Sequence, residues 1–267
     1  MTTTDAGALF DRNAARYDLV NSLITFGQDA RWRRWAARTA LALAAPPPLG
    51  EPPCLLDACA GSGLVGVAVA RRGASVTLAD ASPVMLERAR RRAAARRLPV
   101  ELVVADLAAP PPFAPASFDA VTLAFGLRYL PDPVLALAHL ATLLRPGGAL
   151  VMLEAVVPSA SGADGGAGHD AASGLAPAAS GLAPAASHVA AAASHIAERY
   201  FFEVAPRIGS LVAGRAELYE RLVATVAAFG GAADLRGLLV AAGLEPVAER
   251  RWAFGLVVGV AARPTPV

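Results

Sequence analysis

The sequence predicts an α/β protein with a mostly parallel, seven-stranded sheet and helices on both of its faces. Two observations predict this fold: strand-like and helix-like segments alternate through the middle of the chain, and a glycine-rich turn follows the first strand. The expected strands are residues 54–58, 75–79, 101–105, 120–124, 149–156, 246–251 and 253–262. The helices expected between the first five are residues 64–72, 83–97 and 133–144. Ser82 and Asp132, each followed by proline, are expected to cap two of these helices.

The chain divides by composition into four consecutive parts. These are an N-terminal helical lid (1–45), an α/β core (46–157), an insert of low complexity rich in Ala, Ser, Gly and Pro (158–193), and cover helices with the closing strands (194–267). Serines recur every seven residues in the insert, but Pro177 and Pro184 interrupt the repeat, so we expect a flexible expansion rather than a coiled coil.

Composition restricts the class of protein. With 267 residues and 55% hydrophobic content, the chain can bury a large core. The mean hydropathy of +0.46 is inflated by alanine. We expect no membrane-spanning helix, no secretory signal and a cytoplasmic protein. Cys54 and Cys59 are interpreted as small buried or semi-buried thiols rather than as a disulfide, and no metal site is expected.

Every basic residue is arginine, and many of the arginines cluster at 31–38 and 88–97. These clusters are either solvated helix faces or a surface attracted to an anionic membrane, for example peripherally at the inner membrane face. The sequence leaves both interpretations open, and it leaves a homodimer open as well.

The first strand ends at Asp57 and leads into glycines at positions 61, 63 and 66, a spacing that lets the backbone approach a nucleotide-like ligand. The same turn occurs in dinucleotide-binding folds. However, a carboxylate at Asp57 would repel a pyrophosphate, whereas it suits the ammonium and sulfonium groups of S-adenosyl-L-methionine. We therefore expect Asp57, Gly61 and Gly63 to contact this cofactor.

Two further acids follow the second and third strands. The carboxyl ends of parallel strands line one crevice, so Asp57, Asp80 and Asp106 are expected at the same edge of the sheet. We assign Asp80 to the ribose hydroxyls, because a carboxylate can accept hydrogen bonds from a diol. Asp106 is assigned to the adenine amino group, with Leu107 packed beside the ring.

Several segments resemble the ubiquinone and menaquinone biosynthesis C-methyltransferases, which are class I S-adenosylmethionine-dependent enzymes with a Rossmann-like fold. The segments that carry the resemblance are Phe10-Asp11-Arg12, Ala15-Arg16-Tyr17-Asp18, Phe125-Gly126-Leu127-Arg128, Arg145-Pro146-Gly147-Gly148, Leu153-Glu154 and Pro206-Arg207-Ile208-Gly209-Ser210-Leu211. The resemblance implies methylation of a ring carbon of a prenylated quinol. It also implies cofactor contacts at Ser62, Asp80, Asp106, Leu107 and Ala124. Tyr129 departs from the family pattern, which has Asn at this position.

For the reaction, Arg128 is our candidate for the cation that stabilises a phenolate oxygen of the quinol, and Tyr17 is expected to order the ring or a water. The alternative for Arg128 is a surface salt bridge. Two other functions stay open: a small-molecule methyltransferase with a different acceptor, and a non-enzymatic cofactor-binding subunit. Nucleic acid is not expected as a partner, because the fourth strand lacks the Asn- or Asp-Pro-Pro-aromatic motif of amino methylation.

Overall fold

The computed structural model describes residues 18–158, 194–213 and 216–266. One seven-stranded sheet organises them, in the order β3-β2-β1-β4-β5-β7-β6. Strands β1 to β5 are parallel to one another, and β7 runs antiparallel to both β5 and β6. The strands are Cys54–Ala58 (β1), Ser75–Asp80 (β2), Glu101–Val104 (β3), Phe118–Ala124 (β4), Leu144–Ala155 (β5), Leu244–Trp252 (β6) and Val257–Pro264 (β7). The predicted seven-stranded, mostly parallel sheet is confirmed.

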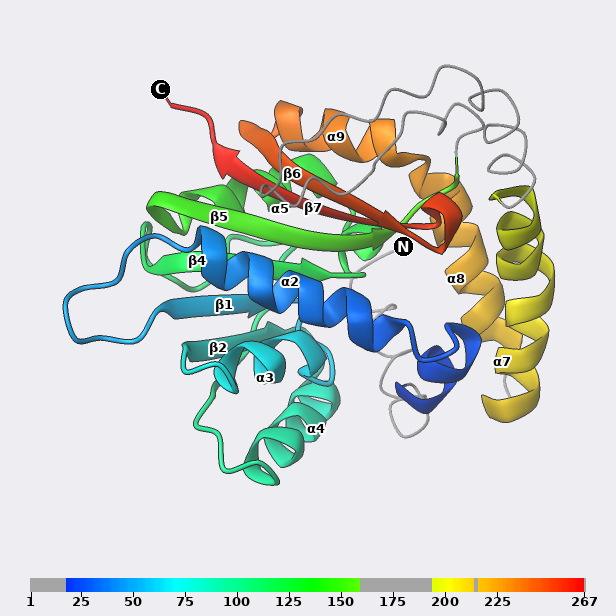
Figure 1. Cartoon of the computed structure of the whole chain (residues 1–267), viewed down its shortest axis with the longest axis horizontal. Helices are drawn as coiled ribbons and strands as arrows, with labels where there is room; N and C mark the ends of the chain where they lie inside the picture. Colours follow the sequence, from blue (N-terminus) through cyan, green and yellow to red (C-terminus); the bar gives the residue numbers. More distant parts are fainter. Residues whose placement is uncertain (1–17, 159–193, 214–215, 267) are drawn as a thin grey trace, which may run out of the picture.

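Helices cover both faces of the sheet, as Figure 1 shows. One face carries α2 (Asp29–Leu43), α3 (Leu64–Ala70) and α4 (Pro83–Ala94), and the other carries α5 (Pro133–Thr142) and α9 (Ala232–Ala241). Two of these helices begin as predicted. Ser82 Oγ accepts a hydrogen bond from the Met85 amide (3.0 Å), and Asp132 Oδ1 accepts one from the Leu135 amide (2.9 Å).

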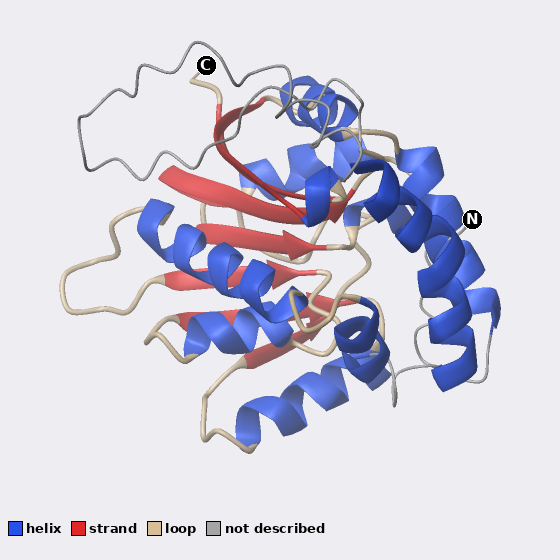
Figure 2. Cartoon of the chain, turned by 45° about the vertical axis from the view of Figure 1, so that its right-hand side comes forward, coloured by secondary structure: helices blue, strands red, loops and turns tan. Residues whose placement is uncertain are grey.

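Further helices lie beyond the carboxyl ends of the parallel strands (Figures 1 and 2). They are the helical residues 18–24, the π-helical turn η2 (Tyr200–Val204), α7 (Ala205–Ala213) and α8 (Ala216–Phe229). Tyr200 connects two of these segments, because its hydroxyl donates a hydrogen bond to the Ile24 carbonyl (2.9 Å). Segments that are far apart in the sequence therefore meet over the edge of the sheet where the predicted acidic residues lie.

Some predicted boundaries are wrong. Strand β5 begins at Leu144 rather than at residue 149, because the Arg145–Gly148 segment stays within the strand and Leu144 pairs with Phe118 of β4. The strand predicted for 253–262 begins instead with a 3₁₀ turn, η3 (Ala253–Gly255), in which Ala253 and Phe254 adopt positive φ of 48° and 54°. Helices α3, α4 and α5 end two or three residues earlier than predicted.

The described residues contain no helix that is both long enough and apolar enough to cross a membrane. Residues 159–193 of the insert and residues 1–17 of the predicted N-terminal lid lie outside the described residues.

Candidate active site

The turn after β1 has the backbone conformation that its glycines predict. Gly61 and Gly63 have φ of +53° and +74°, values that favour glycine. Gly66 is required for packing, because a Cβ there would lie 2.1 Å from Cδ2 of Leu78. A Cβ at Gly63 would lie 2.8 Å from Cβ of Ala89. The turn is thus packed tightly against β2 and α4.

Asp57 holds the glycine turn in place through hydrogen bonds. Its Oδ2 accepts a hydrogen bond from the Gly66 amide (2.7 Å), and its Oδ1 accepts one from the Thr122 hydroxyl of β4 (2.6 Å). Only 2% of the residue is exposed, and burial raises the pKa of the carboxyl to about 7. The sequence predicted a cofactor contact here; the structure adds that Asp57 connects the glycine turn to the neighbouring strand.

Asp80 is held by two backbone amides at the end of β2. The amide of Gly61 donates to its Oδ2 (2.7 Å) and the amide of Ser82 to its Oδ1 (2.9 Å). Asp106 stands after β3 and accepts a hydrogen bond from the Ala108 amide (2.9 Å), beside the buried Leu107. The acids that were predicted at one edge of the sheet therefore do lie together.

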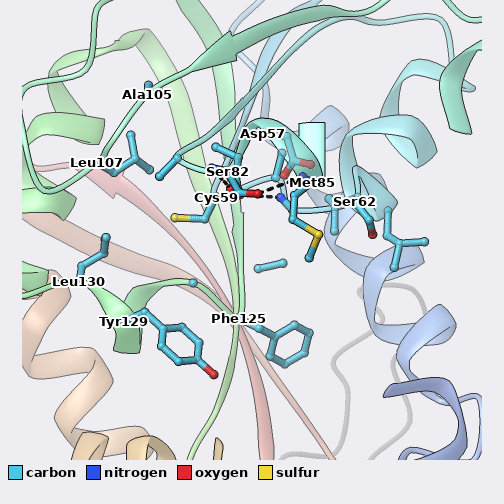
Figure 3. Close-up of a pocket in the computed structure, with 18 of the residues that line it drawn as sticks. Asp57, Cys59, Ser62, Ser82, Met85, Ala105, Leu107, Phe125, Tyr129 and Leu130 are labelled. Atoms are coloured by element: carbon cyan, nitrogen blue, oxygen red, sulfur yellow. Dashed lines mark hydrogen bonds between the residues drawn. The ribbon is translucent and has the colours of Figure 1, made fainter. Parts of the chain in front are cut away.

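These residues surround a cavity of about 130 Å³, the cofactor cavity, which Figure 3 shows in close-up. It is lined by all the predicted cofactor residues except Gly63: Asp57, Gly61, Ser62, Asp80, Asp106, Leu107 and Ala124. Three carboxylates and one cation, Arg33, make up its charged groups. This set suits a ribose diol and an ammonium group and would repel a pyrophosphate, so it fits S-adenosylmethionine.

Ser62 also connects the glycine turn to the N-terminal segment. Its hydroxyl donates to Oδ1 of Asp18 (2.7 Å), and Arg92 of α4 pairs with the same carboxylate. Asp18 was not among the predicted site residues, although it belongs to the Tyr17-Asp18 motif that carried the family resemblance. Tyr17 itself, the predicted partner of the ring, lies outside the described residues.

A second cavity of about 350 Å³, the acceptor cavity, adjoins the first. Its lining is mostly apolar and comes from the helical turn around residues 21–28, from α2, from the segment 196–201 and from η3 with the start of β7. Arg33, Phe125 and Tyr129 line both cavities, so the two meet at these residues. A methyl donor in one cavity would therefore lie next to an apolar acceptor in the other.

The backbone is strained where the cavities meet. Cys59 and Phe125, at the exits of β1 and β4, have positive φ of 51° and 59° although neither is glycine. Gly126 allows these two exits to approach, because a Cβ there would lie 2.5 Å from Cβ of Cys59. Strain of this kind concentrates at functional sites.

Arg128 belongs to a buried ion pair with Glu154 of β5, and the exposed fractions of the two side chains are 2% and 0%. A surface salt bridge, the alternative considered for Arg128, is therefore wrong. Burial raises the pKa of Glu154, and the guanidinium opposes this effect. Arg128 also donates from Nη2 to the Tyr129 hydroxyl (3.3 Å) and lies over that ring, with Cζ 4.6 Å from the centroid. The sequence predicted Arg128 at the site and missed Glu154 as its partner.

Comparisons with known proteins show the family to which the chain belongs. The ubiE/COQ5 methyltransferase family model matches residues 2–164 and 185–262. The demethylmenaquinone methyltransferase of Thermus thermophilus is 36% identical over 239 residues, which cover 89% of this chain and 91% of the relative. The enzyme of the same name from Deinococcus radiodurans is 34% identical over 250 residues, covering 93% and 88%.

Among solved structures, an O-methyltransferase family protein from Burkholderia thailandensis has a TM-score of 0.55 at 18% identity, covering 94% of this chain and 60% of that one. This similarity shows the fold, and it confirms the prediction of a class I methyltransferase architecture. The family match adds the chemistry, because S-adenosylmethionine is the cofactor of this family. The chain thus belongs to the ubiE/COQ5 methyltransferase family and is an S-adenosylmethionine-dependent methyltransferase.

Proposed function

We propose that this enzyme methylates a ring carbon of a reduced polyprenyl quinol, and that the quinol is demethylmenaquinol. The observation that carries the proposal is that the cofactor cavity shares Phe125 and Tyr129 with a larger, mostly apolar cavity. The names of the Thermus and Deinococcus relatives support the choice of substrate.

The acceptor cavity suits a flat, apolar ring that carries a hydrocarbon tail. Its lining includes Trp32, Phe125, Tyr200 and Phe201, whose rings can pack against a naphthoquinol. Three further residues of the lining, Phe26, Ile196 and Phe254, are exposed by 73%, 70% and 62%. We infer that the prenyl tail leaves the cavity past these exposed side chains, because they would bury apolar surface against it.

S-adenosylmethionine supplies an electrophilic methyl group on a sulfonium sulfur. The residues of the chain hold the two reactants in line, and such positioning contributes a large part of the rate in methyl transfer. Asp80 would hold the ribose, and the Gly61 turn would bring the backbone close to the cofactor. The quinol ring would lie against Phe125 and Tyr129, which line both cavities.

A carbon–carbon bond forms as the sulfur–methyl bond breaks, the electron pair of the broken bond stays on sulfur, and the ring proton at the attacked carbon leaves to water. The quinol must be reduced, because only the electron-rich ring can attack. The positive field of Arg128 favours loss of a hydroxyl proton from the quinol, which makes the ring carbon more nucleophilic.

Complementation tests the proposal. The chain is expressed in a bacterial host that lacks its own demethylmenaquinone methyltransferase, and the quinones are extracted and identified by mass spectrometry. We expect menaquinone to return, and the Asp80→Ala variant serves as the control with weakened cofactor binding. Accumulation of demethylmenaquinone despite folded protein in the cells would reject this substrate.

A further inference from the structure

Tyr129 lies where the cofactor cavity and the acceptor cavity meet. It lines both, as Phe125 does, and Figure 3 shows the two rings at the end of the cofactor cavity away from Asp57. The ring belongs to the short turn η1 (Leu127–Tyr129) directly after β4, so its backbone is fixed to the central sheet. A polar group at this place would lie beside the ring of a bound acceptor and also near the methyl group of a bound cofactor.

Arg128 orients the hydroxyl of Tyr129. The guanidinium donates to the phenol oxygen (3.3 Å) and lies over the ring, at 4.6 Å between Cζ and the centroid. Arg128 also lines the acceptor cavity, but it is paired with Glu154, and with 2% of its side chain exposed it presents little surface to a ligand. Glu154, Arg128 and Tyr129 thus form a row that runs from the buried end of β5 to the junction of the cavities.

The direction of the hydrogen bonds in this row determines what Tyr129 can do. A guanidinium only donates, so the Tyr129 oxygen is the acceptor in its contact with Arg128. A phenol has one O–H to donate, and a ring oxygen of a quinol in the acceptor cavity is an acceptor for it. Arg128 would then act on the substrate through the tyrosine and through its field.

We propose that Tyr129 is the residue that positions the acceptor: its hydroxyl donates a hydrogen bond to a ring oxygen of the quinol and so turns the neighbouring ring carbon toward the methyl group. This inference rests on the proposed function, because it needs a quinol as the acceptor. It assigns Tyr129 a direct contact with substrate, and it makes Arg128 and Glu154 positioning residues that act through it.

Two variants of Tyr129 separate the hydroxyl from the ring. Tyr129→Phe removes the donor and keeps the ring under the guanidinium, whereas Tyr129→Leu removes both. We expect Tyr129→Phe to raise KM for a short-chain demethylmenaquinol about tenfold, the scale of one lost hydrogen bond, with the dissociation constant for S-adenosylmethionine unchanged. We also expect the share of oxygen-methylated product to rise, since the ring is no longer held by its oxygen. Tyr129→Leu should raise KM for the quinol further, because it also removes the aromatic ring that lines both cavities.

Thr142→Ala is the control, because it removes a hydroxyl that lies outside both cavities. That hydroxyl donates to the His139 carbonyl (2.7 Å), so we expect an unchanged KM for the quinol and an unchanged ratio of carbon to oxygen methylation. Parental KM and product ratio in Tyr129→Phe would overturn the inference, as would a loss of cofactor affinity in place of quinol affinity. If the unaltered enzyme methylates no quinol at all, the proposed function itself has failed, which is a different result.

Discussion

Arg128 and Glu154 form an ion pair inside the protein, across the junction between the loop after β4 and the end of β5. Both strands end beside the acceptor cavity, so the pair fixes the part of the sheet edge against which the substrate would lie. A buried pair of this kind is sensitive to the loss of one partner, because the remaining charge has no compensation. This sensitivity distinguishes it from the exposed pairs of the chain, such as Arg90 with Glu87 on α4.

Loss of one partner should therefore destabilise the fold strongly. We expect Arg128→Gln to lower the free energy of unfolding by about 3–5 kcal/mol, because Glu154 stays buried without its cation. Replacing both residues together, as Arg128→Met with Glu154→Leu, should restore most of that stability. Urea denaturation of the single and double variants measures the change in the free energy of unfolding. A loss of about 1 kcal/mol or less in the single variant, the value of a surface pair, would contradict the buried geometry.

Asp57 should make stability depend on pH. Its folded pKa of about 7 lies above the ordinary value of 3.8. The folded state therefore binds more protons than the unfolded chain between about pH 4 and 7. The contribution to stability is complete below about pH 4 and is lost as the pH rises to 7, by on the order of 4 kcal/mol.

The Asp57→Asn variant isolates this contribution, because its amide can still accept from the Gly66 amide and can donate to the Thr122 hydroxyl oxygen. We expect the difference in unfolding free energy between the parent and Asp57→Asn to change between pH 4.5 and pH 7.5. Parallel stability curves for the two proteins across this range would show that the carboxyl is not perturbed.

Asp80 should determine cofactor affinity. Asp80→Ala is expected to weaken S-adenosylmethionine binding by about 1.5–3 kcal/mol, because a charged acceptor for the ribose hydroxyls is lost. The same change releases the Gly61 and Ser82 amides, so Asp80→Asn, which retains one acceptor oxygen, is the control and should lose less. Isothermal titration calorimetry gives both affinities. If the parent and Asp80→Ala bind S-adenosylmethionine with equal affinity, Asp80 does not bind the ribose.

The insert should be dispensable. Residues 165–184 fall between the two ranges matched by the family model, and a shorter connection closes at slightly lower entropic cost. We expect deletion of 165–184 to leave the melting temperature and the methyl-transfer rate unchanged. A large loss of either would show that the repeat packs on the enzyme, contrary to the flexible expansion that its composition predicts.

Local sequence signals predicted much of the cofactor cavity. Asp57, Asp80 and Asp106 lie at or just after the carboxyl ends of three parallel strands, so the sheet itself brings them together once the strands are recognised. Asp18 and Glu154 were missed because their roles depend on partners 44 and 26 residues away in the chain, at Ser62 and Arg128. No local pattern reports such a pairing.

The errors in the strands have similar causes. Gly147 and Gly148 predict a turn, yet tertiary pairing of Leu144 with Phe118 extends β5 past them. At η3 the positive φ falls on Ala253 and Phe254, which carry no signal for that conformation. Both residues line the acceptor cavity, so this local irregularity coincides with the site.

Transfer of an isotopically labelled methyl group shows whether the two cavities bring the sulfonium methyl and a quinol ring carbon together. The purified enzyme is incubated with S-adenosylmethionine carrying a deuterated methyl group and with chemically reduced demethylmenaquinone, and the product is analysed by mass spectrometry and NMR. We predict one labelled methyl group on the ring carbon, formed only from the reduced substrate and at least about tenfold more slowly by Tyr129→Phe at limiting quinol. Cofactor binding with no label in the quinol, or label on oxygen alone in the unaltered enzyme, would contradict the account.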